Sequence, residues 1–98
     1  KAMDTVTTYQ YIVKSPGICG GKPCISGHRI RVQDIASDHE NLGLSPDAIC
    51  DAHPGLNLAQ VHAALAYYFD HREEILGEIE ADREFADSFR EQHPDSVR

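Results

Sequence analysis

The stretch "GLSPDAICDAHPGLNLAQVHAALAYY", residues 43–68, decides the fold. Ser45 followed by Pro46 is the preferred chemistry for a helix start, with a capping side chain and then proline at the first helical position. Pro54 and Gly55 end that short helix, and Asn57 is a good cap for the next one. The apolar residues of the second helix recur at steps of three and four, which is typical of a core-facing stripe: Leu58, Val61, Ala64, Leu65, Tyr68 and Phe69. The stretch therefore predicts two helices joined by a tight turn.

Upstream of this stretch, a further helix and several short strands are expected. Apolar residues spaced from Val32 to His39 predict a helix over about 31–42, with Gly43 as its C-cap. Residues 8–14, "TYQYIVK", predict a strand with Tyr9, Tyr11 and Val13 on one side. Residues 23–25 and 28–32 read as two shorter apolar pieces joined by a tight turn at 26–27.

Downstream, the helical pattern has no clear stop before residue 92. Gly77 could mark a bend, so residues 57–92 are either one long helix or two. Apolar side chains continue into a strongly charged stretch where few other apolar groups could cover them. We therefore expect a second subunit or another protein to cover Leu76, Ile79, Phe85 and Phe89.

Length and composition predict one mainly α domain of 98 residues. We divide it into an N-terminal strand or arm (1–15), a three-helix part (16–69) and an acidic C-terminal helical extension (70–98). No apolar run approaches the ~20 residues of a membrane span, and the first residues lack the apolar core of a signal peptide. Three cysteines, an odd number, favour reduced thiols over a disulfide framework. A cytoplasmic location is expected.

The net charge of −7 is unevenly distributed. Residues 1–36 carry five basic and two acidic side chains, a net of +3, whereas residues 37–98 carry four arginines and fourteen acids, a net of −10. Such a division suggests that the two parts face different partners, although acidic residues also simply solvate helix surfaces.

The glycine-rich stretch "GICGGKPCISGHRIRV", residues 17–32, raises three chemical hypotheses. A phosphate loop is disfavoured, because proline follows Lys22 where Ser or Thr would hold magnesium. Cys19 and Cys24 with His28 fit zinc spacing only loosely, and buried small apolar thiols are the simpler interpretation. No cysteine–histidine or carboxylate arrangement carries the signature of a catalytic site. We expect no enzyme activity, no metal and no cofactor.

Three short helices with tight turns are what a helix-turn-helix requires. Asn57, Gln60 and His62 would then face the DNA groove, since Asn and Gln can bond adenine bidentately. Phosphate contacts would fall to Lys22, Arg29 and Arg31, because the reading helix has no basic residue before Arg72. An ordinary three-helix bundle whose polar face meets water is the alternative.

Two segments of the chain resemble the bacterial family called domain of unknown function 433. The first is "GICGGKPCISGHRIRVQDI" and the second is residues 43–68. The family pattern is Gly-Gly-Lys-Pro, a short apolar strand, Gly-Thr-Arg-Ile-Pro-Val, a helix, a Ser-Pro-Glu-like helix start and a Pro-x-Leu turn. The resemblance covers about residues 12–69. His28 and Arg31 stand where the family pattern has threonine and proline.

The resemblance implies a homeodomain-like three-helix fold preceded by short strands, in a homodimer. Such proteins are regarded as antitoxin-like regulators that bind operator DNA and hold a small PIN-like nuclease toxin. The basic residues before 36 would serve DNA, and the acidic residues after 69 would serve the nuclease. The alternative function is a protein-interaction or dimerisation module that does not bind DNA.

Overall fold

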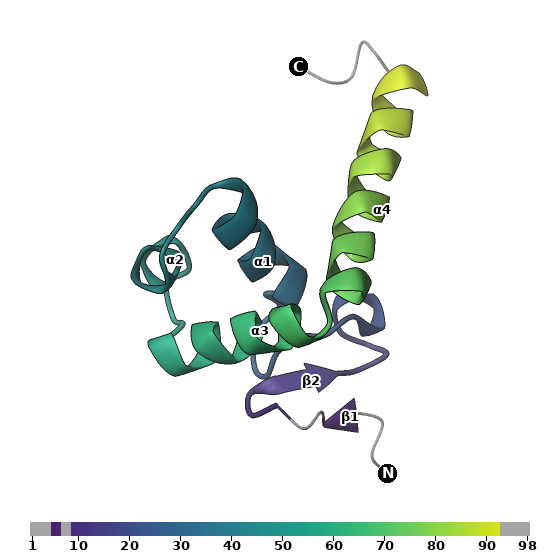
Figure 1. Ribbon diagram of the computed structural model, residues 1–98. Helices are drawn as coiled ribbons and strands as arrows, with labels where there is room; N and C mark the ends of the chain where they lie inside the picture. The colour runs from purple at the N-terminus through teal and green to yellow at the C-terminus, as the bar shows by residue number, and fades with distance from the viewer. Residues whose placement is uncertain (1–4, 7–8, 93–98) are drawn as a thin grey trace.

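The computed structural model describes residues 5–6 and 9–92, and these form a mainly helical fold with a small antiparallel sheet. Four α-helices follow three short strands and one 3-10 turn within the described ranges (Figure 1). Their bounds are β1 (Thr5–Val6), β2 (Ile12–Lys14), η1 (Cys19–Gly21), β3 (Cys24–Ile25), α1 (Val32–Asn41), α2 (Pro46–Ala52), α3 (Leu58–Asp70) and α4 (Arg72–Gln92). The mainly α prediction is thus confirmed at this level.

The sheet has the order β1-β2-β3, with both neighbouring pairs antiparallel. Ile12 lies opposite Ile25, and both side chains are fully buried. After β3 the chain reverses at residues 26–27, where the His28 amide donates to the Ile25 carbonyl at 2.9 Å. Gly27 has a φ of +82°, which a side-chain-bearing residue adopts only at a cost. The predicted tight turn is confirmed.

The prediction of a strand over 8–14 with Tyr9, Tyr11 and Val13 on one side is wrong in its extent. Residue 8 lies outside the described residues, and β2 begins only at Ile12. Tyr11 has a φ of +74°, which is incompatible with a strand. Its carbonyl instead accepts the Ser26 amide at 2.7 Å. Ile12, which the alternation placed on the other side, is the residue buried in the core.

The helix starts follow the local chemistry of the sequence. The Ser45 hydroxyl accepts the Ala48 amide at 3.2 Å, and Pro46 is the first residue of α2. Asn57 caps α3. Gly43 follows the end of α1 with a φ of +69°, the left-handed conformation that commonly ends a helix. The predicted bounds of the first two helices and the predicted start of the third are confirmed.

The question of one helix or two after Asn57 is settled by His71. This residue has φ −131° and ψ 46°, so it is not helical, and its ring stacks on the Tyr67 ring with centroids 4.2 Å apart. Gly77 lies inside the continuous helix α4. Two helices therefore meet at His71, and α4 leaves the body in a different direction from α3 (Figure 1).

The core lies where the sheet and the first three helices meet. The first turns of α4, residues 72–79, also contribute to it, and we call them the root of α4. Ile35, Ile49, Tyr68 and Ile75 are all fully buried, and they come from the four different helices. Burying a side chain of this size stabilises the fold by about 1.5–3 kcal/mol relative to exposure. The first turns of α4 are therefore part of the body.

Candidate functional site

The outer half of α4 projects from the body as an arm (Figure 1). Ile75 is fully buried and Ile79 packs against the core, but every residue from 80 to 92 is exposed. We use the name "arm" for residues 80–92. A helical segment of this length is marginal in water by itself, so the anchored root of α4 holds it in place. The arm is thus the exposed part of α4, and its residue Asp82 contacts the body.

The predicted contact residues Leu76, Ile79, Phe85 and Phe89 do not form one surface. Leu76 and Phe85 are nine residues apart, which is about two and a half helical turns and places them on opposite sides of α4. Phe85 is 74% exposed and Phe89 43%, and they are four residues apart on one face. That face also carries Asp82, which contacts the body, so the two aromatic rings continue the body-facing side of the helix.

Three donors of the body converge on the Asp82 carboxylate. Lys22 Nζ lies 3.4 Å from Oδ1, while Arg31 Nη1 and Gln33 Nε2 lie 3.2 Å and 2.9 Å from Oδ2. We call these four residues the Asp82 cluster. Arg31 also pairs with Asp34 at 2.9 Å and caps the start of α1. Two of the three cations predicted to contact DNA phosphates thus pair with the chain's own α4.

The cluster changes the acidity of its members. Partial burial favours the neutral form of Asp82, but Lys22, Arg31 and the Gln33 amide outweigh it and lower the pKa of this carboxyl. The hydrogen bond with Asp34 raises the pKa of Arg31, which therefore stays charged. One turn earlier on α4, burial and the neighbouring Glu74 raise the pKa of Glu78 despite three nearby cations. This surface therefore favours the ionised form of Asp82.

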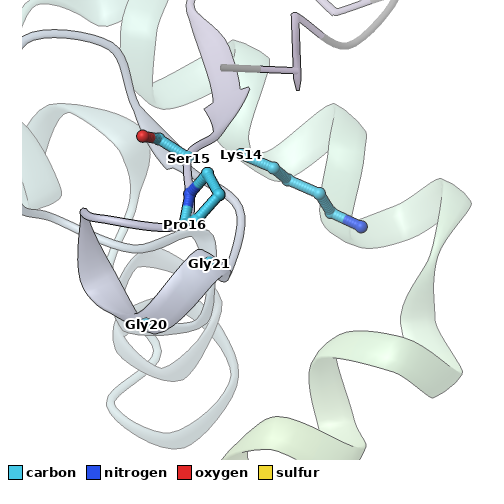
Figure 2. A pocket seen from close by; sticks show the side chains of 5 residues that line it. All are labelled: Lys14, Ser15, Pro16, Gly20 and Gly21. Atoms are coloured by element: carbon cyan, nitrogen blue, oxygen red, sulfur yellow. The ribbon is translucent and has the colours of Figure 1, made fainter. Parts of the chain in front are cut away.

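A second ion pair holds the root of α4. Lys14, at the end of β2, lies 3.2 Å from Glu74, which also accepts the Tyr67 hydroxyl at 3.1 Å. Figure 2 shows Lys14 extending away from Pro16 and the two glycines that line the same shallow pocket. The pairs at residues 74 and 82, eight residues apart, tie one side of α4 to the sheet and its loops.

The predicted base-reading residues lie elsewhere, at the start of α3. Figure 1 shows α3 running from α2 to the base of α4, so its first residues lie at the end far from the arm. Asn57 and His62 are exposed, and Gln60 is half-buried. Arg29 is exposed on the loop after Gly27, and a side chain at Gly55 would lie 3.7 Å from the neighbouring His28. Arg29 thus follows His28, a residue whose ring lies close to Gly55 in the turn before α3.

The cysteines are not joined in disulfides, and Cys24 is almost fully buried, in keeping with a small apolar residue. The Cys19 thiol donates to the Arg29 carbonyl at 3.4 Å. Among the described residues, no group of three or more His, Cys, Asp or Glu side chains is arranged to hold a metal ion. None of the helices described is long and apolar enough to cross a membrane.

Sequence reasoning missed Asp82 and Gln33. Both belong to charged or polar helical runs, and their partners lie 49 to 60 residues away in the chain. The one available signal is the phase of α4: Asp82 lies seven residues after Ile75, on the same face as that buried residue. A carboxylate at such a position needs a partner from the body.

The model of the family described as protein of unknown function (DUF433) matches residues 12–68. The chain belongs to this family. The chain is also similar to the crystal structure of a DUF433 member protein from Anabaena variabilis ATCC 29413. The two are 32% identical, with a TM-score of 0.64, over 70% of this chain and 67% of that one. The search of curated proteins finds no match.

Proposed function

We propose that this protein is a non-catalytic, antitoxin-like regulator that binds a partner protein through the α4 arm. The supporting observation is the arm itself, an ordered helix in which Phe85 is 74% exposed and every neighbouring residue meets solvent. An amphipathic helix with an exposed aromatic face is a common way to occupy a groove in another protein. In this proposal the body is a homeodomain-like three-helix unit that carries the arm.

The charge of α4 defines the partner's chemistry. The helix contains three arginines and eight acids: Glu73, Glu74, Glu78, Glu80, Asp82, Glu84, Asp87 and Glu91. Two copies of so acidic a helix would repel each other, whereas a basic groove would attract it. A small nuclease, whose substrate site must be cationic, has the required charge. The family resemblance to antitoxins of PIN-like nucleases points to the same class of partner.

Binding of the chain to a small PIN-like nuclease, first of all to any such protein encoded by an adjacent gene, tests this proposal. The variant Phe85→Ser removes an exposed ring, so it should leave the unfolding temperature unchanged while weakening binding at least about tenfold, as loss of an interface aromatic does. Leu76→Ser is the matched control, because Leu76 is also exposed but lies on the opposite side of α4. Equal affinities for wild type and Phe85→Ser, measured by calorimetry, would exclude the arm as the binding element.

Operator binding is the second candidate function, and the arrangement of α2 and α3 favours it. The two helices are joined by a tight turn, and Asn57 and His62 are exposed at the start of α3. A helix presented in this way can enter the major groove. Arg29 would supply a phosphate contact from the neighbouring loop.

A salt series with the chain's own upstream DNA tests operator binding. The expected affinity is selective for that sequence and falls as salt rises, because each phosphate contact releases counterions. The variant Arg29→Gln should lower the affinity for all sequences alike and reduce the salt slope by about one. If the chain binds its upstream DNA no more tightly than an unrelated duplex, operator binding is excluded. The remaining function is then the protein-interaction module, whose partner is a second copy of the chain or the nuclease.

A further inference from the structure

We propose that Lys22, Arg31 and Gln33 form a binding site for a phosphate group, and that Asp82 of α4 closes this site as an internal competitor. The inference adds regulation to the function proposed above, because the element expected to bind a partner also fills the site. It rests on the geometry of the Asp82 cluster.

The first observation is the convergence of the donors. An ammonium, a guanidinium and an amide, from the loop before β3, the start of α1 and its first turn, all point at one carboxylate within 3.4 Å. Planar guanidinium groups and lysine ammonium groups are the usual partners of phosphate oxygens. A carboxylate presents the same negative oxygens on a smaller group, so Asp82 stands where a phosphate oxygen would bind.

The second observation is the depth of Gln33. Its side chain is only 4% exposed although it is polar, and its Nε2 is directed at Asp82. The Oε1 atom is buried and has no hydrogen-bond partner among the described residues. Burying a side-chain amide whose oxygen has no hydrogen-bond partner costs free energy. A buried amide beneath an exposed carboxylate is therefore unusual on a surface that only meets water.

The third observation is that Asp82 is accessible to solvent. The side chain of Asp82 is 47% exposed, and those of Lys22 and Arg31 are about 30% exposed. Ion pairs exposed to this degree are weak and exchange readily with ions from solution. Asp34 pairs with Arg31 Nη2 and Glu78 lies near Lys22 and Arg31, so these two carboxylates reduce the positive charge that an anion would meet.

The consequence is a coupling between the arm and the anion. A partner that binds the arm and moves Asp82 out of the cluster leaves Lys22, Arg31 and Gln33 available to an anion. Conversely, an anion bound to these three residues displaces Asp82 and makes the arm available to a partner. Such coupling is reciprocal in binding free energy.

The test measures binding of two probes to the isolated chain: inorganic phosphate by calorimetry and a duplex oligonucleotide by fluorescence anisotropy. Asp82→Ala removes the competing carboxylate and leaves room for an oxyanion. Asp87→Ala is the control, because it changes the net charge by the same amount on an exposed turn of α4. We expect Asp82→Ala to bind phosphate about five- to tenfold more tightly than wild type and Asp87→Ala, as typical couplings are of this size. Adding Lys22→Gln to Asp82→Ala should abolish the gain.

The two probes distinguish the sources of the phosphate group. A gain for phosphate alone indicates a small phosphate-bearing ligand, and a gain for both indicates the nucleic-acid backbone. No gain for either probe, an equal gain in Asp87→Ala, or a gain that survives Lys22→Gln overturns the proposal. Asp82→Asn, of nearly the same shape, replaces Asp82→Ala if circular dichroism shows that the latter is unfolded. Because no partner protein is used, a negative result leaves the arm's proposed function standing.

Discussion

Asn57 and Gln60 cap the start of α3 reciprocally. The backbone N–H of Gln60 donates to the side-chain Oδ1 of Asn57, and the backbone N–H of Asn57 donates to the side-chain Oε1 of Gln60, each at 2.9 Å. This capping box satisfies two backbone donors that the first turn would otherwise leave without helical partners. Both side chains predicted to read bases therefore also have a structural role.

Asn57→Ala should lower the free energy of unfolding by about 1 kcal/mol, the usual cost of losing an N-cap. Asn57→Ser keeps a capping oxygen and should stay within a few tenths of a kcal/mol of wild type. Urea denaturation of both variants measures the difference. If Asn57→Ser retains stability but loses operator affinity, Asn57 reads a base as well as capping α3.

Gly77→Ala should stabilise the protein by about 0.5–1 kcal/mol, because alanine is the better residue inside a helix. A Cβ at this position would meet nothing within 4 Å, so no clash offsets the gain. Gly43→Ala is the contrasting variant, since its φ of +69° disfavours alanine and stability should fall. Thermal unfolding should move the two midpoints in opposite directions, and a fall for Gly77→Ala would show that α4 needs glycine there.

Ile75→Ala should cost about 2–4 kcal/mol, because it removes a fully buried side chain from the core. Leu76→Ala, at the adjacent and 41% exposed position, should change stability by no more than about 0.5 kcal/mol. Chemical denaturation of the pair tests whether the root of α4 belongs to the body. Similar small effects in both variants would mean that the body is stable without α4.

Glu78→Gln should raise the unfolding temperature at pH 7. Burial and Glu74 raise the pKa of Glu78 above 4.5, so the folded chain binds this proton more tightly than the unfolded chain does. The ionised carboxylate thus opposes folding above its folded-state pKa, and the opposition disappears below pH 4.5. The gain should therefore vanish at pH 4. Glu84→Gln, on an exposed turn, is the control and should give no such pH-dependent gain.

The parts of the fold that local chemistry specifies were predictable from the sequence. Ser45 with Pro46, Asn57, and Gly43 each act within one helical turn, so the end of α1 and the starts of α2 and α3 follow from the residues themselves. The break at His71 was not predictable, because no proline or glycine marks it. It depends on the stacking of the His71 ring on Tyr67 and on the burial of Ile75.

The candidate site was less predictable, because it depends on contacts between distant parts of the chain. An alternating pattern around Tyr11 cannot say which side the helices will cover, and the structure buries Ile12. Similarly, Lys22 and Arg31 look available for phosphates until the fold brings Asp82 between them. Charge counts along the chain separate the basic and acidic parts but do not show that they meet.

The helix α4 is buried in the core at its start and exposed toward its end. Phe89 lies fourteen residues beyond the buried Ile75, a length of about 21 Å along the helix axis. A rotation of about 10° at the root would thus move Phe89 by roughly 4 Å but Asp82 by only about half as much. A change in the tilt of α4 would therefore displace the aromatic face of the arm further than it displaces Asp82.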